Sequence, residues 1–289
     1  RRQRQMCIRD RYDSSGIATV KDDGSLDRRR AVGKLVELQD KLVFEPLKGK
    51  AGIGHTRWAT HGEPNEKNAH PHTRGAVSVV HNGIIENHEN LRKKLSKEGF
   101  KFKSDTDTEV ISHLVNLYKT KGYDFDSAVM RTIAELKGAY ALGIIDLENP
   151  DLVIGAREHS PLVVGEGIEE NFIASDVMAL SQVTNKFKFL QDGQIALIGS
   201  DKIQIMSKNG TAKKIPTQEI DSNSFTNDLA GYSHFMEKEI FEQPKALQDA
   251  LQGRVNSEGT QEGIFGAGFE DQVKDVTNIQ IVACGTSFH

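Results

Sequence analysis

The sequence lacks the features that mark secreted and membrane-spanning proteins. Only two of its 289 residues are cysteines, Cys7 and Cys284, and they lie far apart. Two cysteines cannot build the disulfide framework of a small secreted domain, so a reducing compartment is expected. No apolar run approaches the roughly 18 residues of a membrane helix, and no apolar segment follows the basic residues 1–4 as in a secretory signal. These absences predict a cytoplasmic protein.

The chain also has no large excess of charge of one sign. The 37 Lys and Arg residues are mixed along the chain with 41 Asp and Glu residues, for a formal net charge of −4. This balance gives no reason to expect nucleic acid or an anionic membrane as a partner. The chain is long enough to bury a sizeable core.

The periodicity of apolar residues predicts an α+β protein. Helical spacing predicts helices over 31–42, 86–99, 107–118 and 125–136, with Thr106 and Glu109 forming a capping box at the third. Strand-like runs are short and separated by turns; they occupy 17–20, 51–54, 76–80, 140–145, 152–156, 162–165, 171–175, 187–190, 194–198 and 202–206. A pair of helices followed by many strands favours α+β layers over alternating βαβ units.

The remaining segments suggest a second, incomplete domain. Asp22-Asp23-Gly24 is a hairpin signal, and a short helix is expected over 175–182. Residues 207–227 are polar and resemble a linker, residues 233–251 return to a helix interrupted by Pro244, and residues 279–287 resemble a strand entering a turn of small residues.

The densest chemistry lies between His55 and Asn87, which holds five of the ten histidines and the only Trp. One interpretation is a polar loop region with solvated histidines. Another is a metal site, but no cysteine and no His-x₃-His pair on a helix supports the spacing His70-Pro71-His72, so no metal is expected. A third is a site for a small zwitterion.

Four residues favour the zwitterion. Arg57 offers a planar fork suited to a carboxylate, and Asp107 can accept from an ammonium, although it can also complement the helix dipole. Asn82-Gly83 is the strongest signal for a type I′ hairpin turn, yet it also supplies an amide and an unhindered backbone N–H for an oxyanion hole. Together with Arg57 and Asp107, the oxyanion hole is the favoured interpretation.

Eight segments then match a family. The chain resembles the class II (N-terminal nucleophile) glutamine amidotransferases, and more narrowly those that make glucosamine 6-phosphate, through RYDSSGIA, HTRWATHG, NAHPH, HNGIIENHENLR, SDTDTEVISHL, ENFIASD, SHFMEKEIFEQP and ACGTS. The resemblance runs from Tyr12 to the last residue. It implies a four-layer αββα sandwich lacking its first strand over 12–222, followed over 223–289 by a linker helix and the start of an α/β sugar isomerase domain.

The resemblance also implies an activity. The family attacks the side-chain amide of glutamine with the thiolate of an N-terminal Cys and passes ammonia to an isomerase domain that converts fructose 6-phosphate to glucosamine 6-phosphate. It implies glutamine and fructose 6-phosphate as substrates, no cofactor and a homodimeric full-length enzyme.

Residue roles carry over by position. Arg57 would hold the α-carboxylate of glutamine and Asp107 its α-ammonium, while Asn82 and Gly83 would form the oxyanion hole. Thr60 and His61 match the glutamine-binding loop, and Trp58 would lie near the exit for ammonia. Thr286 and Ser287 match the loop that receives the sugar phosphate.

Cys7 does not fit the nucleophile. The family begins Met-Cys-Gly-Ile-Val-Gly, a buried strand, whereas Cys7 is followed by Ile8, Arg9, Asp10 and Arg11 and lies much closer to Tyr12. Three charges in four positions cannot form a buried strand. We therefore reject Cys7, interpret residues 1–11 as a non-native leader, and expect an inactive chain that folds weakly and aggregates.

Other functions remain open. Another class II amidotransferase, phosphoribosyl-transferring or asparagine-forming, would lack the ACGTS segment. A non-catalytic glutamine-binding or regulatory module would bind glutamine without releasing ammonia, and a metal-binding protein would contain stoichiometric zinc.

Overall fold

The computed structural model describes residues 13–21, 23–57, 62–220, 231–251, 255–256, 259–260, 273–274 and 276–280. The chain divides into two compact units, residues 1–225 and 226–289. The second unit contains helix α6 and a short antiparallel pair, β15 and β16; their bounds are Phe235–Leu251, Val255–Asn256 and Gly259–Thr260. No helix in these ranges has both the length and the apolarity that crossing a bilayer requires.

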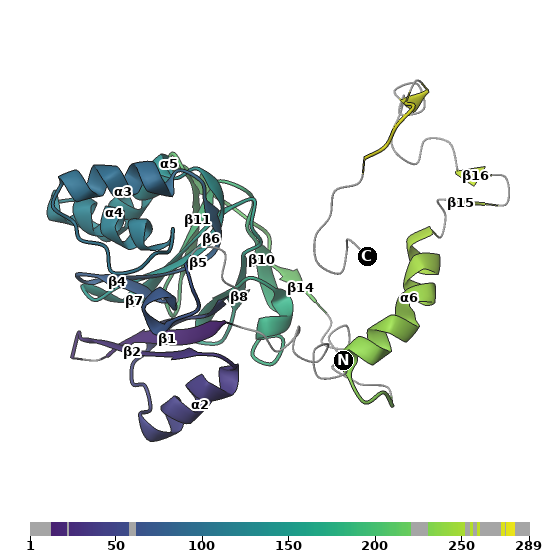
Figure 1. Cartoon of the computed structure of the whole chain (residues 1–289), viewed down its shortest axis with the longest axis horizontal. Helices are drawn as coiled ribbons and strands as arrows, with labels where there is room; N and C mark the ends of the chain where they lie inside the picture. Colours follow the sequence, from purple (N-terminus) through teal and green to yellow (C-terminus); the bar gives the residue numbers. More distant parts are fainter. Residues whose placement is uncertain are drawn as a thin grey trace. The chain divides into compact units, whose positions relative to one another are not determined.

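A seven-stranded antiparallel sheet forms the centre of the first unit (Figure 1). Its strand order is β13-β12-β11-β7-β6-β5-β4. In chain order the bounds are β4 His72–Arg74, β5 Val77–Ile85, β6 Gly138–Asp146, β7 Asn149–Glu158, β11 Gln194–Ile198, β12 Ile203–Ser207 and β13 Ala212–Lys213. Strand β6 is buried from Tyr140 to Asp146 because side chains on both of its faces are covered.

Three helices cover one face of this sheet: α3 (His88–Lys97), α4 (Glu109–Thr120) and α5 (Phe125–Glu135) (Figure 1). Their apolar stripes meet strand residues in the largest core cluster, where Leu95, Leu114 and Ile144 are fully buried. The helical spacing of these side chains is the pattern that predicted α4 and α5 from the sequence.

A second layer of strands packs on the other face. The three-stranded sheet β2-β1-β3 (Leu26–Val32, Ser14–Val20 and Ala51–Arg57) contacts the large sheet through Ala18 and Ile53. Helix α2 (Leu35–Phe44) packs on β1 and β2, on the side away from helices α3 to α5 (Figure 1). The resulting order of helix, sheet, sheet and helix confirms the αββα arrangement.

A four-stranded sheet completes the unit. Its order is β14-β10-β8-β9, and it packs through Val164 and Ile173 on residues of β6, β11 and β12. Its bounds are β8 Val163–Glu166, β9 Asn171–Ala174, β10 Lys186–Phe189 and β14 Gln218–Glu219. Two 3₁₀ helices connect strands, η1 (Glu66–Asn68) and η2 (Val177–Leu180). Every run after Gly138 that the sequence predicted to be a strand forms a strand in the structure.

Four local predictions are wrong. Helix α6 runs through Pro244 without the predicted interruption. The linker expected over 207–227 contains β13 and β14, which extend two sheets. The helix expected from Ala31 begins at Leu35, because Leu26–Val32 pairs with β1. The capping box fails: the N-cap of α4 is Thr108, and Glu109 accepts from the amides of Lys103 and Ser104 instead of from Thr106.

Candidate active site

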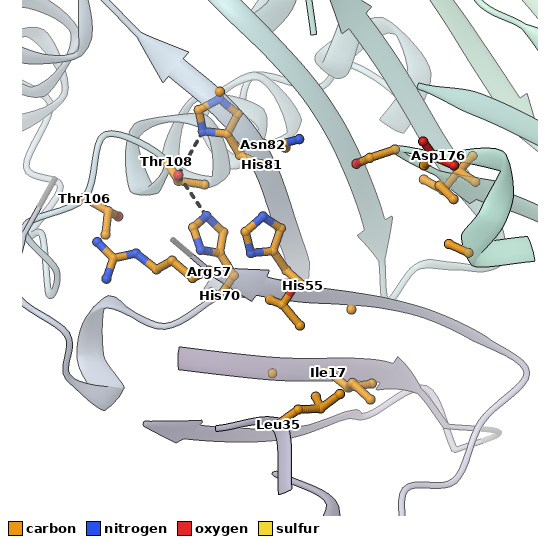
Figure 2. A pocket seen from close by; sticks show the side chains of 18 of the residues that line it. Ile17, Leu35, His55, Arg57, His70, His81, Asn82, Thr106, Thr108 and Asp176 are labelled. Carbon is orange, nitrogen blue, oxygen red and sulfur yellow. Dashed lines mark hydrogen bonds between the residues drawn. The ribbon is translucent and has the colours of Figure 1, made fainter. Parts of the chain in front are cut away.

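One pocket of about 900 Å³ brings together the residues that the sequence singled out (Figure 2). Arg57, Asp107, Asn82 and Gly83 all line it. They come from the end of β3, the turn before α4, and the middle of β5. Residues this far apart in the chain meet because β3 packs against β5 across the two sheets.

Arg57 is the last residue of β3 and is only 3% exposed. Its Nη2 donates to the carbonyl oxygen of Gly62 at 3.2 Å. Burial lowers the pKa of Arg57, while the carboxylates of Asp13 and Asp107 oppose that shift. A guanidinium stays protonated in such a setting, so the pocket carries a fixed positive charge.

Asp107 is equally buried, at 3% exposure. Its Oδ2 accepts from the amide of Ile85 at 2.8 Å and lies 3.9 Å from Nδ1 of His81. The carboxylate is therefore tied to β5, and the pocket holds charges of both signs.

Asn82 and Gly83 do not form the hairpin turn that was the alternative interpretation. Both lie inside β5 and pair with Ala141 and Tyr140 of β6. Gly83 has φ +136°, and a Cβ atom there would lie 2.1 Å from the carbonyl oxygen of Ala139. Only glycine fits this conformation and spacing. The exposed side chain of Asn82 and the backbone of Gly83 line the pocket.

Three of the described histidines in this stretch are buried, contrary to the simplest interpretation of the sequence. His70, His72 and His81 are at most 5% exposed, and the rings of His55 and His70 are 4.4 Å apart. Burial lowers the pKa of His55 to about 4 and of His72 to about 3, and holds that of His70 well below its usual value. These rings are therefore neutral at physiological pH.

Thr108 is a pocket residue that the sequence analysis did not identify as functional. Its hydroxyl lies between His70 and His81, and all three side chains line the pocket (Figure 2). The density of histidines in this region was the signal that could have pointed to such a cluster. Within the described ranges, no group of three or more His, Cys, Asp or Glu side chains is arranged to hold a metal ion.

Other predicted site residues lie outside the described residues. These are Cys7, Trp58, Thr60, His61, Thr286 and Ser287. The structure brings together Arg57, Asp107, Asn82 and Gly83.

Known proteins resemble this chain in sequence. Residues 55–182 match the family described as a glutamine amidotransferase domain. Glutamine–fructose-6-phosphate aminotransferase (isomerizing) of Pseudomonas putida is 46% identical over 279 residues, which is 96% of this chain and 46% of that protein. The protein of the same name from Escherichia coli K12 is 46% identical over 280 residues, again 96% of this chain and 46% of the relative. The chain thus spans about half the length of these relatives.

Solved structures share the fold. Glutamine phosphoribosylpyrophosphate amidotransferase from B. subtilis superposes with a TM-score of 0.59 at 23% identity, over 68% of this chain and 43% of that one. The solved structure of an allosteric regulatory enzyme of purine biosynthesis gives the same TM-score and coverages at 24% identity.

By its matching residues 55–182, the chain carries a class II glutamine amidotransferase domain, and its fold is the one shared by the solved amidotransferase structures. Within that class it is a homologue of the glutamine–fructose-6-phosphate aminotransferases (isomerizing), which it matches along 96% of its own length.

Proposed function

We propose that the first unit binds glutamine and, once a nucleophile is supplied, releases its amide nitrogen as ammonia for the amination of fructose 6-phosphate. The names of the relatives indicate this reaction. The observation that carries the proposal is the pocket in which buried Arg57 and Asp107 lie with Asn82 and Gly83.

The two charged residues suit the two ends of a free amino acid. The guanidinium of Arg57 can bind the α-carboxylate through parallel hydrogen bonds, and the carboxylate of Asp107 can accept from the α-ammonium. Both side chains are almost fully buried, so each interaction is stronger than it would be in water. The carboxamide of glutamine then extends toward Asn82 and Gly83.

Asn82 and Gly83 serve the reacting carbonyl. When a thiolate attacks the amide carbon, the C=O bond becomes a C–O⁻ bond that the Asn82 amide and the Gly83 N–H can stabilise. The C–N bond then breaks, ammonia leaves with an added proton, and a thioester remains. Water hydrolyses the thioester to glutamate and restores the thiol.

Cys7 is not assigned as the nucleophile, because the charges at positions 9–11 do not suit a buried strand. The family places the attacking thiol on an N-terminal Cys whose free amine acts as the base. We therefore propose that this chain binds glutamine but releases little or no ammonia by itself.

Calorimetric titration with glutamine tests the binding site. Arg57→Ala and Asp107→Ala should each weaken glutamine binding at least about tenfold, because each leaves a buried charge of the ligand unpaired. The controls Arg131→Ala and Asp151→Asn change exposed residues outside the pocket and should leave the affinity unchanged. Full affinity in both pocket variants would contradict the proposal.

Ammonia release tests the catalytic part. The assay is run on this chain and on a version that carries the family's N-terminal Cys segment upstream of Tyr12. Release by the extended version alone is the expected result. Glutamine binding without release by either version would identify a non-catalytic glutamine-binding module instead.

A further inference from the structure

The hydroxyl of Thr108 lies between two buried imidazole rings (Figure 2). Its Oγ1 is 2.9 Å from Nε2 of His70 and 3.0 Å from Nδ1 of His81. Thr108 is 1% exposed and occupies the N-cap position of α4, yet its side chain makes no capping hydrogen bond. The hydroxyl is directed at the rings instead of at the helix.

One hydroxyl has one proton, so its two hydrogen bonds cannot be alike. Thr108 donates to one ring nitrogen and accepts from the N–H of the other ring. The negative carboxylate of Asp107, 3.9 Å from Nδ1 of His81, favours the proton on that nitrogen. Thr108 then accepts from His81 and donates to Nε2 of His70.

This arrangement fixes the segment that carries Asp107 to two other parts of the fold. His81 belongs to β5, and His70 lies in the loop before β4. On the other side of Asp107, the hydroxyl of Thr106 is 3.1 Å from Nε2 of His72. Both neighbours of Asp107 are thus held by imidazoles through their hydroxyls.

Helix α3 also holds the segment that carries Asp107. Arg92 of α3 donates through Nη2 to the carbonyl oxygen of Thr106 at 2.8 Å and through Nη1 to that of Ser104 at 3.1 Å. A fixed backbone strengthens the binding of an ammonium group by the Asp107 carboxylate, because the site then loses less conformational freedom on binding.

We propose that Thr108, His70 and His81 form a hydrogen-bonded cluster that positions the carboxylate of Asp107 to bind the α-ammonium of glutamine. This inference rests on the proposed function. The three residues are positioning residues and act through Asp107. Burial keeps the pKa of His70 well below its usual value. A neutral ring there positions the segment without adding a positive charge that would repel the ammonium.

The test compares glutamine with glutaramic acid, the same molecule without its α-amino group. Thr108→Val keeps the shape of the side chain and removes the hydroxyl, and Thr108→Ser keeps the hydroxyl. The valine variant should bind glutamine about five- to tenfold more weakly and bind glutaramic acid within about twofold of the unaltered chain. The serine variant should restore glutamine binding to within about twofold.

A second pair of variants covers the case in which Thr108→Val does not fold, which its thermal transition would reveal. His81→Asn places an amide where Nδ1 lies and should keep glutamine affinity, whereas His81→Gln moves that amide away and should lower it. Affinities come from NMR titration of the full chain.

Three results would overturn this positioning role. They are an equal loss for both ligands in a folded Thr108→Val variant, unchanged binding of both ligands, or equal glutamine affinity in the two His81 variants. Failure of the unaltered chain to bind glutamine would instead overturn the proposed function, and with it the ligand assigned to Asp107.

Discussion

At the scale of single residues, Gly83 shows how closely the pocket depends on the backbone. It sits within a regular strand, opposite Tyr140, but with φ +136° and with the carbonyl oxygen of Ala139 where a Cβ atom would lie. An L-residue is strained at this φ whatever space is available. The position therefore demands glycine for two independent reasons.

Gly83→Ala should consequently destabilise the fold by about 2 kcal/mol or more and abolish glutamine binding, since the strand must shift to relieve the contact. Gly199→Ala is the matched control. Its φ is not in the left-handed region, and its added Cβ would meet no atom closer than 3.6 Å. Urea denaturation of both variants measures the effect, and similar midpoints in the two would show that Gly83 is not constrained.

At the scale of secondary-structure elements, the start of α4 is fixed by Glu109. Its carboxylate accepts from the amides of Lys103 and Ser104 at 2.8 and 2.7 Å and from the Ser104 hydroxyl at 2.6 Å, while Nε2 of His113 lies 3.2 Å away. Burial alone would raise the pKa of Glu109, but these hydrogen bonds outweigh it and lower the pKa to about 2. These hydrogen bonds tie the first residue of α4 to Lys103 and Ser104, in the loop that leads to Asp107.

Glu109→Gln should lower the free energy of unfolding by about 2 kcal/mol, because a neutral amide cannot accept this set of hydrogen bonds as the carboxylate does. The control is Glu89→Gln, an exposed acidic residue in the first turn of α3. Thermal unfolding at pH 7 measures both. A loss no larger than in the control would show that the loop is held by other contacts.

At the scale of the whole molecule, buried histidines connect stability to pH. The pKa values of His55 and His72 fall to about 4 and about 3 in the fold, against about 6.5 in the unfolded chain. At pH values between the folded and the unfolded pKa of each histidine, the unfolded chain binds more protons than the folded chain. Stability is therefore full above about pH 6.5 and falls as the pH drops toward 4.

We expect the melting temperature to decrease between pH 7 and pH 5, a window above that in which Glu109 becomes protonated. His72→Gln keeps a hydrogen-bonding group near Thr106 but does not titrate, so it should make this decrease smaller. The exposed His234→Gln is the control and should leave the pH slope unchanged. A slope in His72→Gln equal to that of the unaltered chain would contradict the role of the buried ring.

The sequence predicted much of the fold because its signals are local. The apolar stripes of α4 and α5 and the short runs after Gly138 depend on neighbouring residues alone. Errors arose where contacts distant in the sequence override them. Thr106 and Glu109 have the spacing of a capping box, but the distant His72 contacts the hydroxyl of Thr106, and Glu109 then accepts from Ser104 in the preceding loop. Asn82-Gly83 is a turn signal that cross-strand pairing overrides.

The sequence by itself determined the family, through long ordered motifs, and the chemical character of Arg57 and Asp107, through side-chain charge and shape. Only the tertiary structure decided that these charges are buried in one pocket, that Gly83 continues a strand, and that the buried rings of His70 and His81 contact the hydroxyl of Thr108. The physical reason is that burial, and with it the strength of a charge or the pKa of a ring, depends on which distant segments pack together.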